Sequence, residues 1–237
     1  VLSSKMMEPE SPACSSAPAT TSCSPSAVAE VEGPADGQTR QVCSSRLTLL
    51  PDALPRGVDV FGWTPRRELA DDENGLDLVL LLARNSVCKG GSMGCALASA
   101  DGSVFACGVN GPIGEITEGK RPDSQVHAEV NAIGLCARRG KATEGATAYI
   151  TMPPCKKCFT VLCASGIRRV VSRKPVGQQD AKEMLPAAKR LGIEFVVVED
   201  TAERRVVLDQ LVAGSACGGA ESAPGDVKRR RLEKEVV

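Results

Sequence analysis

The sequence predicts an α/β fold of three layers, in which a mixed five-stranded sheet carries helices on both faces. The chain has 237 residues, of which 42% are hydrophobic, so one domain of ordinary size can bury a core. Its first structured segments read as a helix followed by two strands, and strands then alternate with helices. Strands joined by a tight turn pair antiparallel, while strands separated by helices pair parallel, so this order predicts a mixed sheet.

The first half of the predicted domain reads as a helix, a strand pair and a helix. Residues 72–87, DENGLDLVLLLARNSV, have helical length and a Leu-rich face. Residues 92–111 predict two short strands joined by Asp101-Gly102, a typical hairpin turn. Residues 124–140 predict a helix, because Ala, Ile and Leu recur on one side and Gly140 ends the pattern.

The second half alternates three strands with three helices. Pro154 near the start and Gly166 at the end mark the first of these helices. Pro186 predicts a kink in the second, because proline removes a backbone donor from the helix interior. The predicted strands span residues 145–152, 167–172 and 193–200, and the predicted helices span residues 154–166, 180–192 and 202–212.

The two ends differ from this domain in composition. Residues 1–56 are rich in Ser, Pro, Ala and Thr and predict a disordered segment. Their acidic residues argue against a transit peptide, although organelle targeting stays open. Residues 214–237 predict a flexible tail, in which Lys228–Arg231 form either a solvated charge run or a nuclear localisation patch. The remaining residues, 57–213, form the predicted domain.

Charge and cysteine content narrow the functional classes. The chain has 29 basic and 29 acidic residues and only six aromatic residues, which disfavours a nucleic-acid-binding surface. Eleven cysteines, an odd number without a regular framework, indicate a reducing compartment such as the cytoplasm or nucleus. No apolar run reaches the roughly 20 residues of a membrane span, so we expect no membrane insertion.

The only histidine, His127, and a Cys-x-x-Cys pair predict a metal site. Cys155 and Cys158 lie three residues apart at a predicted helix start, so both sulfurs face one side. Zinc prefers four nitrogen and sulfur ligands, and three protein ligands leave one position for water, which is the catalytic arrangement. Two alternatives stay open: a redox-active cysteine pair, and a structural zinc with Cys136 or Cys163 as the fourth ligand.

Glu129 follows the histidine by two residues and gives the predicted site a proton carrier. A carboxylate at this position can accept a proton from water activated by the metal and deliver it to a leaving amine. The sequence therefore predicts one catalytic Zn²⁺ ion held by His127, Cys155 and Cys158, with Glu129 as the catalytic acid and base.

The order His-x-Glu followed by Pro-Cys-x-x-Cys is typical of zinc deaminases. With HAEVNAI at 127–133 and PPCKKC at 153–158, the chain resembles the cytidine and deoxycytidylate deaminase superfamily over residues 74–198. The resemblance implies a cytidine deaminase-like fold and a hydrolase in which zinc hydroxide attacks an aminated ring carbon and ammonia leaves. It also implies a homo- or hetero-oligomer, because related deaminases complete their pockets across subunits.

Three further residues match the family as substrate contacts. Asn110, in GVNGP, resembles the asparagine that contacts the sugar, and it equally suits a simple turn with Gly111. The backbone N–H of Ala128 resembles the group that meets the pyrimidine carbonyl. Asn131 fits the HAExNA form of the deoxycytidylate branch, although a solvated helix face would explain it as well.

The motifs favour a cytosine nucleotide or nucleoside as substrate, with conversion of dCMP to dUMP as the first choice. A nucleotide needs a cationic phosphate site. Four nearby cations suit that role or a solvated loop: Lys120, Arg121, Lys156 and Lys157. Two alternatives remain: a subunit of a tRNA adenosine or cytidine deaminase, and a catalytically silent zinc-binding partner subunit. Silent subunits commonly lose the proton-carrying glutamate, which this chain retains.

Overall fold

The computed structural model describes residues 45–114, 116–117 and 119–217. Within these residues, no helix is both long enough and apolar enough to cross a bilayer. The elements, in chain order, are β1 (Thr48–Leu49), α1 (Asp71–Ala83), β2 (Gly94–Ala98), β3 (Ser103–Val109), α2 (Ala128–Arg139), β4 (Thr147–Ile150), α3 (Lys156–Ala164), β5 (Arg169–Ser172), α4 (Gln178–Leu191), β6 (Glu194–Val197) and α5 (Ala202–Cys217).

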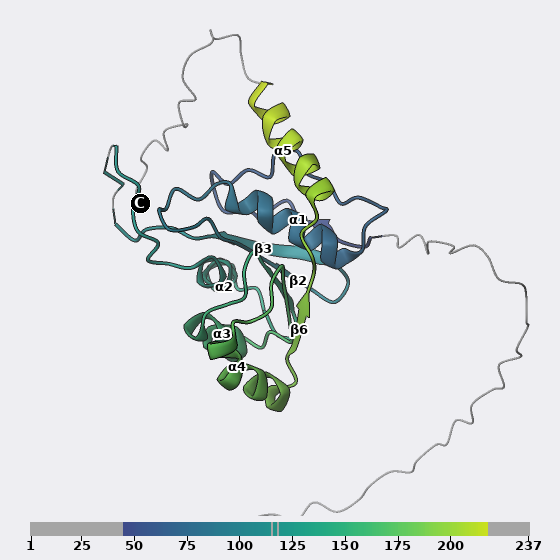
Figure 1. The fold of residues 1–237 in the computed structure, drawn as a ribbon, viewed down its shortest axis with the longest axis vertical. Coiled ribbons are helices and arrows are strands. Elements are labelled where there is room, and N and C mark those ends of the chain that lie inside the picture. The colour runs from purple at the N-terminus through teal and green to yellow at the C-terminus, as the bar shows by residue number, and fades with distance from the viewer. Residues whose placement is uncertain (1–44, 115, 118, 218–237) are drawn as a thin grey trace, which may run out of the picture. The chain divides into compact units, whose positions relative to one another are not determined.

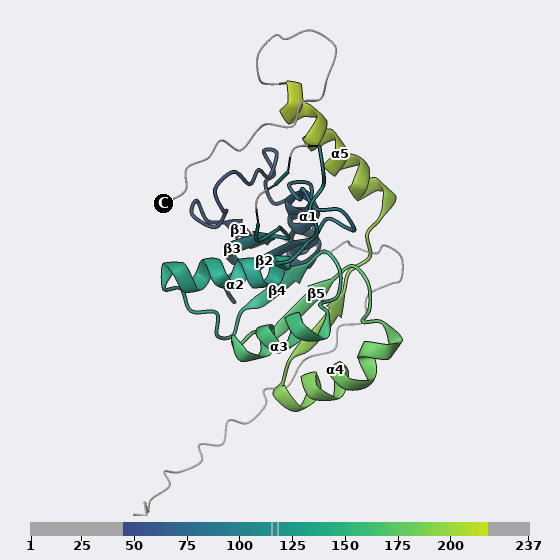
Figure 2. The ribbon, with the colours of Figure 1, turned by 90° about the vertical axis from the view of Figure 1, so that its left-hand side faces the viewer.

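The strands form one mixed sheet in the order β1-β3-β2-β4-β5-β6. β2 pairs antiparallel with both β3 and β4, whereas β1 pairs parallel with β3 and the series β4, β5, β6 is parallel throughout. All five predicted helices and all five predicted strands are present, and the predicted mixed α/β architecture is confirmed (Figures 1 and 2).

The sheet has six strands rather than the predicted five, and the extra strand is β1. It lies inside the segment 1–56 for which composition predicts disorder. The Thr48 N–H donates to the Gly102 carbonyl at 3.0 Å, and Leu47 and Ala53 are buried. A two-residue strand carries too little periodicity to be recognised from sequence. Residues 1–44, for which disorder is predicted, lie outside the described residues, and so does the basic run Lys228–Arg231.

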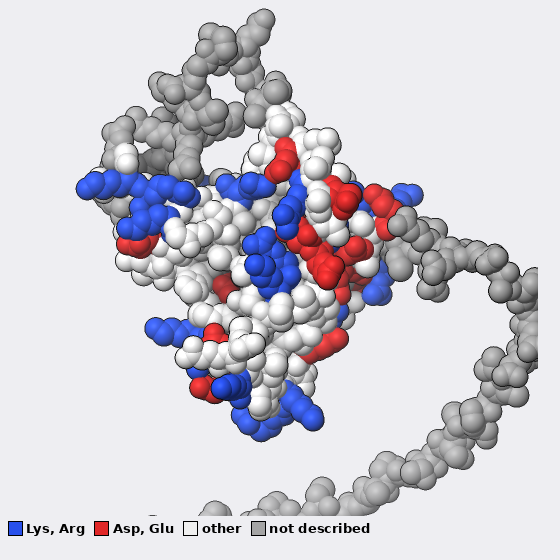
Figure 3. All heavy atoms as spheres, in the orientation of Figure 1, with Lys and Arg blue, Asp and Glu red and all other residues white. Residues whose placement is uncertain are grey.

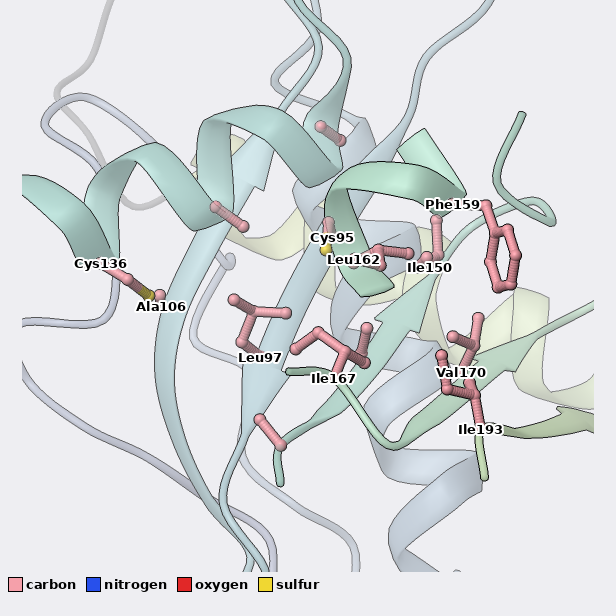
Figure 4. Close-up of a cluster of buried hydrophobic side chains, with 14 of the residues drawn as sticks. Cys95, Leu97, Ala106, Cys136, Ile150, Phe159, Leu162, Ile167, Val170 and Ile193 are labelled. Carbon is pink, nitrogen blue, oxygen red and sulfur yellow. The ribbon is translucent and has the colours of Figure 1, made fainter. Parts of the chain in front are cut away.

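Helices cover both faces of the sheet. Helices α2, α3 and α4 pack on one face, over a core that includes Leu97, Ile150 and Leu162 (Figures 2 and 4). Helix α1 packs on the other face, with α5 against it, and this second core includes Tyr149 and Leu208. Adjacent residues Tyr149 and Ile150 face opposite layers, as strand alternation requires. Helix α4 continues through Pro186, the residue at which a kink is predicted.

Strand direction places the start of two helices at one edge of the sheet. Because β3 and β4 are both antiparallel to β2, their carboxyl ends lie at the same edge. Helix α2 follows β3, and α3 follows β4. The N-termini of α2 and α3 therefore converge at this carboxyl edge, where the two metal-ligand motifs of the sequence also lie.

Candidate metal centre

The three predicted metal ligands come together at the N-termini of α2 and α3. His127 is the N-cap residue of α2, Cys155 is the N-cap residue of α3, and Cys158 lies in the first turn of α3. The His127 Nδ1 atom lies 3.2 Å from the Cys158 sulfur and 3.7 Å from the Cys155 sulfur. All three ligand atoms lie within 4.8 Å of one another.

These separations fit a shared tetrahedral ion. With zinc–nitrogen and zinc–sulfur bonds of about 2.0 and 2.3 Å, tetrahedral neighbours are about 3.5 Å apart. The cluster has no fourth side-chain ligand among the described residues, and neither Cys136 nor Cys163 belongs to it. His127 is exposed while Cys158 is buried, so the cluster borders solvent on one side. The donor set is compatible with one zinc ion held by three side chains.

The electrostatics of the cluster also favour a cation. Burial raises the pKa of the Cys158 thiol, and the nearby negative charge of Glu129 raises it further. A thiol in such surroundings becomes a thiolate when a divalent cation compensates both effects. The positive end of the α3 dipole acts in the same direction at Cys155.

Glu129 lies where the sequence places the proton carrier. It is in the first turn of α2, and only 5% of its surface is exposed. Its negative charge is close enough to Cys158 to raise the pKa of that thiol. A carboxylate beside the ligand cluster and shielded from bulk water is well placed to exchange protons with a molecule bound there.

The two predicted asparagine contacts both hold backbone segments in place. Asn110 is buried, and its amide nitrogen donates to the Gly91 carbonyl at 3.0 Å and to the Ser124 hydroxyl at 3.1 Å. Its side-chain oxygen accepts from the Met93 N–H at 2.8 Å. Asn131 donates to the Val109 carbonyl at 2.7 Å, so α2 is tied to the end of β3.

The predicted phosphate cations are less free than the sequence suggests. The Lys156 ammonium lies 2.9 Å from the Glu183 carboxylate and 3.8 Å from that of Asp180, both on α4. Arg121 donates to the Cys88 carbonyl at 2.6 Å. At least two of the four cations therefore already have partners within the chain.

Sequence reasoning missed two residues that support the metal-ligand loop. The Thr151 hydroxyl accepts from the Gly94 N–H at 2.9 Å and so fixes the end of β4 to β2. Arg173 lies against the Met152 sulfur, with Nε at 3.3 Å. Neither residue belongs to a recognisable motif, so only the tertiary structure reveals these contacts.

Comparison with known proteins agrees with this geometry. The family model described as "Cytidine and deoxycytidylate deaminase zinc-binding region" matches residues 69–174. The deoxycytidylate deaminase of Mycobacterium phage D29 is 31% identical over 123 residues, which cover 44% of this chain and 94% of that protein. The deoxycytidylate deaminase of Enterobacteria phage T2 is 46% identical over 48 residues, covering 20% of this chain.

The extent of these matches differs between relatives. The chain spans about a quarter of the T2 protein, 26% of its length. Among solved structures, the apo dCMP deaminase of cyanophage S-TIM5 aligns at 24% identity with a TM-score of 0.46, over 54% of this chain and 96% of that one. The range matched by the family model, residues 69–174, contains His127, Cys155 and Cys158.

Proposed function

The chain belongs to the cytidine and deoxycytidylate deaminase family, and from this premise we propose that it hydrolytically removes the amino group of a cytosine nucleotide, converting dCMP to dUMP. The observation that carries the proposal is the three-ligand cluster of His127, Cys155 and Cys158 with Glu129 beside it. Hydrolysis needs a nucleophilic water and a proton carrier. The three ligands would hold the zinc ion that activates the water, and Glu129 would carry the proton.

His127, Cys155 and Cys158 would hold one zinc ion. When bound, the ion supplies Lewis-acid chemistry that makes water nucleophilic near neutral pH. The chain contributes ligands that are already gathered by two helix starts, so little conformational freedom is lost on binding.

Glu129 would take a proton from the attacking water and deliver it to the departing amino group. Its position in the first turn of α2 keeps the carboxylate fixed relative to His127. The Ala128 N–H is at the first helical position, where an α-helix leaves the donor without an intrahelical partner. This N–H would donate to the pyrimidine carbonyl and so orient the ring.

Asn110 and Asn131 would contact the substrate through their side-chain oxygens. An amide oxygen accepts two hydrogen bonds. The Asn110 oxygen accepts one, from the Met93 N–H, and that of Asn131 accepts none from the described residues. Each oxygen thus keeps capacity for a hydroxyl donor of the substrate, while the amide nitrogens hold the backbone.

The choice of dCMP is supported by the names of the relatives. The T2 and D29 proteins are both named deoxycytidylate deaminases. The choice over a tRNA substrate is also supported by the equal numbers of basic and acidic residues, 29 each, because RNA binding generally requires excess positive charge.

The test is an ammonia-release screen of the zinc-loaded chain with dCMP, deoxycytidine, CMP, cytidine, guanine and a tRNA anticodon stem-loop. We expect the highest kcat/KM for dCMP. Glu129→Gln should retain zinc and lose at least about 100-fold in rate, as is typical for loss of a general acid–base. The matched control, Glu203→Gln at an exposed position of α5, should keep the wild-type rate.

Each other outcome selects an alternative. Turnover of the stem-loop alone would support a tRNA deaminase subunit. A wild-type chain that binds zinc but releases no ammonia from any substrate would support a silent partner subunit. Undiminished turnover by Glu129→Gln would contradict the role of Glu129 as proton carrier.

We also propose that the chain self-associates, as its family resemblance implies. The loop before His127 exposes two large apolar side chains, Ile113 at 76% and Ile116 at 51%. Exposed apolar groups next to a site are typical of surfaces covered in an assembly. Light scattering should give a mass above 24.7 kDa, and Ile113→Asp should lower it. A fully active monomer would contradict the proposal.

A further inference from the structure

A cavity opens at the carboxyl edge of the sheet, on the face that carries α1 and α5. Its volume is about 720 Å³, and Thr151, Arg173 and Asp200 contribute to its lining from the ends of β4, β5 and β6. Arg84 at the end of α1 and Arg205 on α5 complete its rim. Cavities of this size suit small metabolites.

This cavity lies on the opposite face of the sheet from the helices that carry the metal ligands. Side chains alternate along a strand, so Val171 points to one face of β5 and Val170 to the other. Val171 is buried in the core beneath α1, whereas Val170 is buried beneath α2, α3 and α4. Arg173, directly after β5, lines the cavity together with Leu80 of α1 and Leu208 of α5, and therefore lies on the α1 and α5 side of the sheet.

One carboxylate holds two arginines together in the cavity. The Asp200 Oδ2 atom accepts from Arg173 at 3.3 Å and from Arg205 at 2.9 Å. The Asp200 side chain is only 7% exposed, and its other oxygen has no partner among the described residues. Two guanidinium groups that share one carboxylate leave an uncompensated positive charge, which costs free energy unless an anion approaches.

The remaining charges of the lining leave this excess in place, because the charge of Glu199 balances that of Lys174 and Asp209 balances Arg84. Lys174 is exposed and forms no ion pair within the described part of the chain, and Arg84 is bonded to Asp209 on α5. The only other lining carboxylate is that of Glu199. Figure 3 shows Lys and Arg atoms gathered beside Asp and Glu atoms on the face that carries α5.

We propose that this cavity binds a phosphate group, held by Arg173, Arg205 and Lys174. Each guanidinium uses some of its five N–H groups on Asp200 and keeps others for a ligand. Planar guanidinium groups approaching from β5 and α5, with an ammonium nearby, suit the several oxygens of a tetrahedral phosphate. The cavity is wide enough for a phosphorylated small molecule as well as for free phosphate.

The site would touch the loop that carries the metal ligands. Arg173 contacts the Met152 sulfur through Nε, and Thr151 lines the cavity. Thr151 and Met152 lie just before Cys155 in the chain. Phosphate binding would therefore restrain the segment that leads into α3. Phosphate binding is measured without turnover, so its result does not depend on whether the chain deaminates dCMP.

The experiment is calorimetric titration of the zinc-loaded chain with inorganic phosphate at low ionic strength. We expect one saturable site, and a dissociation constant raised about tenfold or more by Arg173→Gln, Arg205→Gln or Lys174→Gln. Lys174→Gln removes no ion pair or side-chain hydrogen bond within the described residues, so its effect reports on binding and not on folding. The matched control is Arg190→Gln, at an exposed position of α4, which should bind phosphate as the wild type does.

Unchanged affinity in all three cavity variants, or the absence of a saturable site, would overturn the proposal. Repeating the titration with saturating dUMP distinguishes two sources of the phosphate. If phosphate still binds, the cavity takes a second molecule. If dUMP displaces phosphate from the wild type, and Lys174→Gln weakens dUMP binding but not deoxyuridine binding, the cavity takes the phosphate of the nucleotide.

Discussion

Arg204 on α5 and Asp77 on α1 form a buried ion pair across 127 residues of sequence. The Arg204 Nη2 and Nε atoms donate to the Asp77 Oδ1 atom at 2.6 and 2.9 Å. The other Asp77 oxygen accepts from Arg66 at 2.9 Å, and Arg204 also donates to the carbonyls of Glu73 and Glu199. Both carboxylate oxygens of Asp77 and all three guanidinium nitrogens of Arg204 take part in hydrogen bonds. These bonds fasten α5 to α1.

Removal of Arg204 should leave Asp77 with an incompletely compensated charge. Loss of one partner of a buried pair typically costs 3–5 kcal/mol, and Arg66 offsets part of that cost. We expect Arg204→Met to lower the free energy of unfolding by about 2–3 kcal/mol in urea titrations. Arg190→Met, at an exposed position of α4, should change it by less than about 0.5 kcal/mol. Equal stability of the two variants would show that the pair does not hold α5.

The pair also shows where the sequence is informative and where it is not. Helix α1 was predictable, because its apolar residues recur over a helical length. In that pattern Asp77 is only an interruption, and nothing local identifies a partner 127 residues away. The clustering of His127, Cys155 and Cys158 was predictable for the opposite reason, since zinc chemistry limits the residue types and spacing that can form such a site. The cavity at Asp200 has no such local signature.

Gly108 on β3 sets how closely α2 approaches the sheet. A Cβ atom added there would lie 2.2 Å from the Ala128 carbonyl oxygen and 2.5 Å from the Ala132 nitrogen. Both are backbone atoms of α2, so the helix would have to move. Because α2 carries His127 and Glu129 at its start, such a movement would displace the metal site.

We therefore expect Gly108→Ala to destabilise the chain by about 1–3 kcal/mol and to weaken zinc binding. Gly134 offers a matched control in the same helix, since a Cβ atom there meets only the flexible Arg138 side chain at 3.4 Å. Gly134→Ala should stabilise by up to about 1 kcal/mol, because alanine is the better helix former. Thermal unfolding and zinc titration check both variants. Destabilisation of similar size in both would contradict the close-approach explanation.

The metal centre predicts which cysteines matter for zinc content. His127→Ala and Cys158→Ala each remove one of three ligands and should reduce bound zinc well below one ion per chain. Cys163→Ala should retain the full zinc content, because Cys163 lies outside the cluster although it follows in the same helix. Elemental analysis after gel filtration provides the measurement. Zinc loss in Cys163→Ala, with folding intact, would instead indicate a four-ligand structural site.

Asp71 connects the segment before β1 to the start of α1. Its Oδ1 atom accepts from the Ser45 hydroxyl at 2.8 Å and from the backbone N–H groups of Arg46 and Leu47 at 2.7 and 3.2 Å. Burial alone would raise the pKa of Asp71, but these three hydrogen bonds outweigh it and hold the pKa below its ordinary value.

This lowered pKa makes the contribution of Asp71 to stability dependent on pH. The unfolded chain protonates this carboxyl near pH 4, before the folded chain does, so acid favours unfolding. The stabilisation is complete above that pH and is lost as the pH falls through the lower pKa of the folded state. Asp71→Asn should therefore be less stable than the wild type by about 1 kcal/mol at pH 6, with the difference shrinking at pH 3.

Urea unfolding at both pH values, together with Ser45→Ala and the double variant, checks this prediction. Ser45→Ala removes one of the three hydrogen bonds, so its effect should be smaller when Asp71 is already asparagine, because a neutral amide oxygen accepts more weakly than a carboxylate. Additive effects of the two substitutions would show that the Ser45 hydroxyl does not stabilise the carboxylate. A wild-type advantage that stays constant between pH 6 and pH 3 would mean that Asp71 acts through packing and not through its charge.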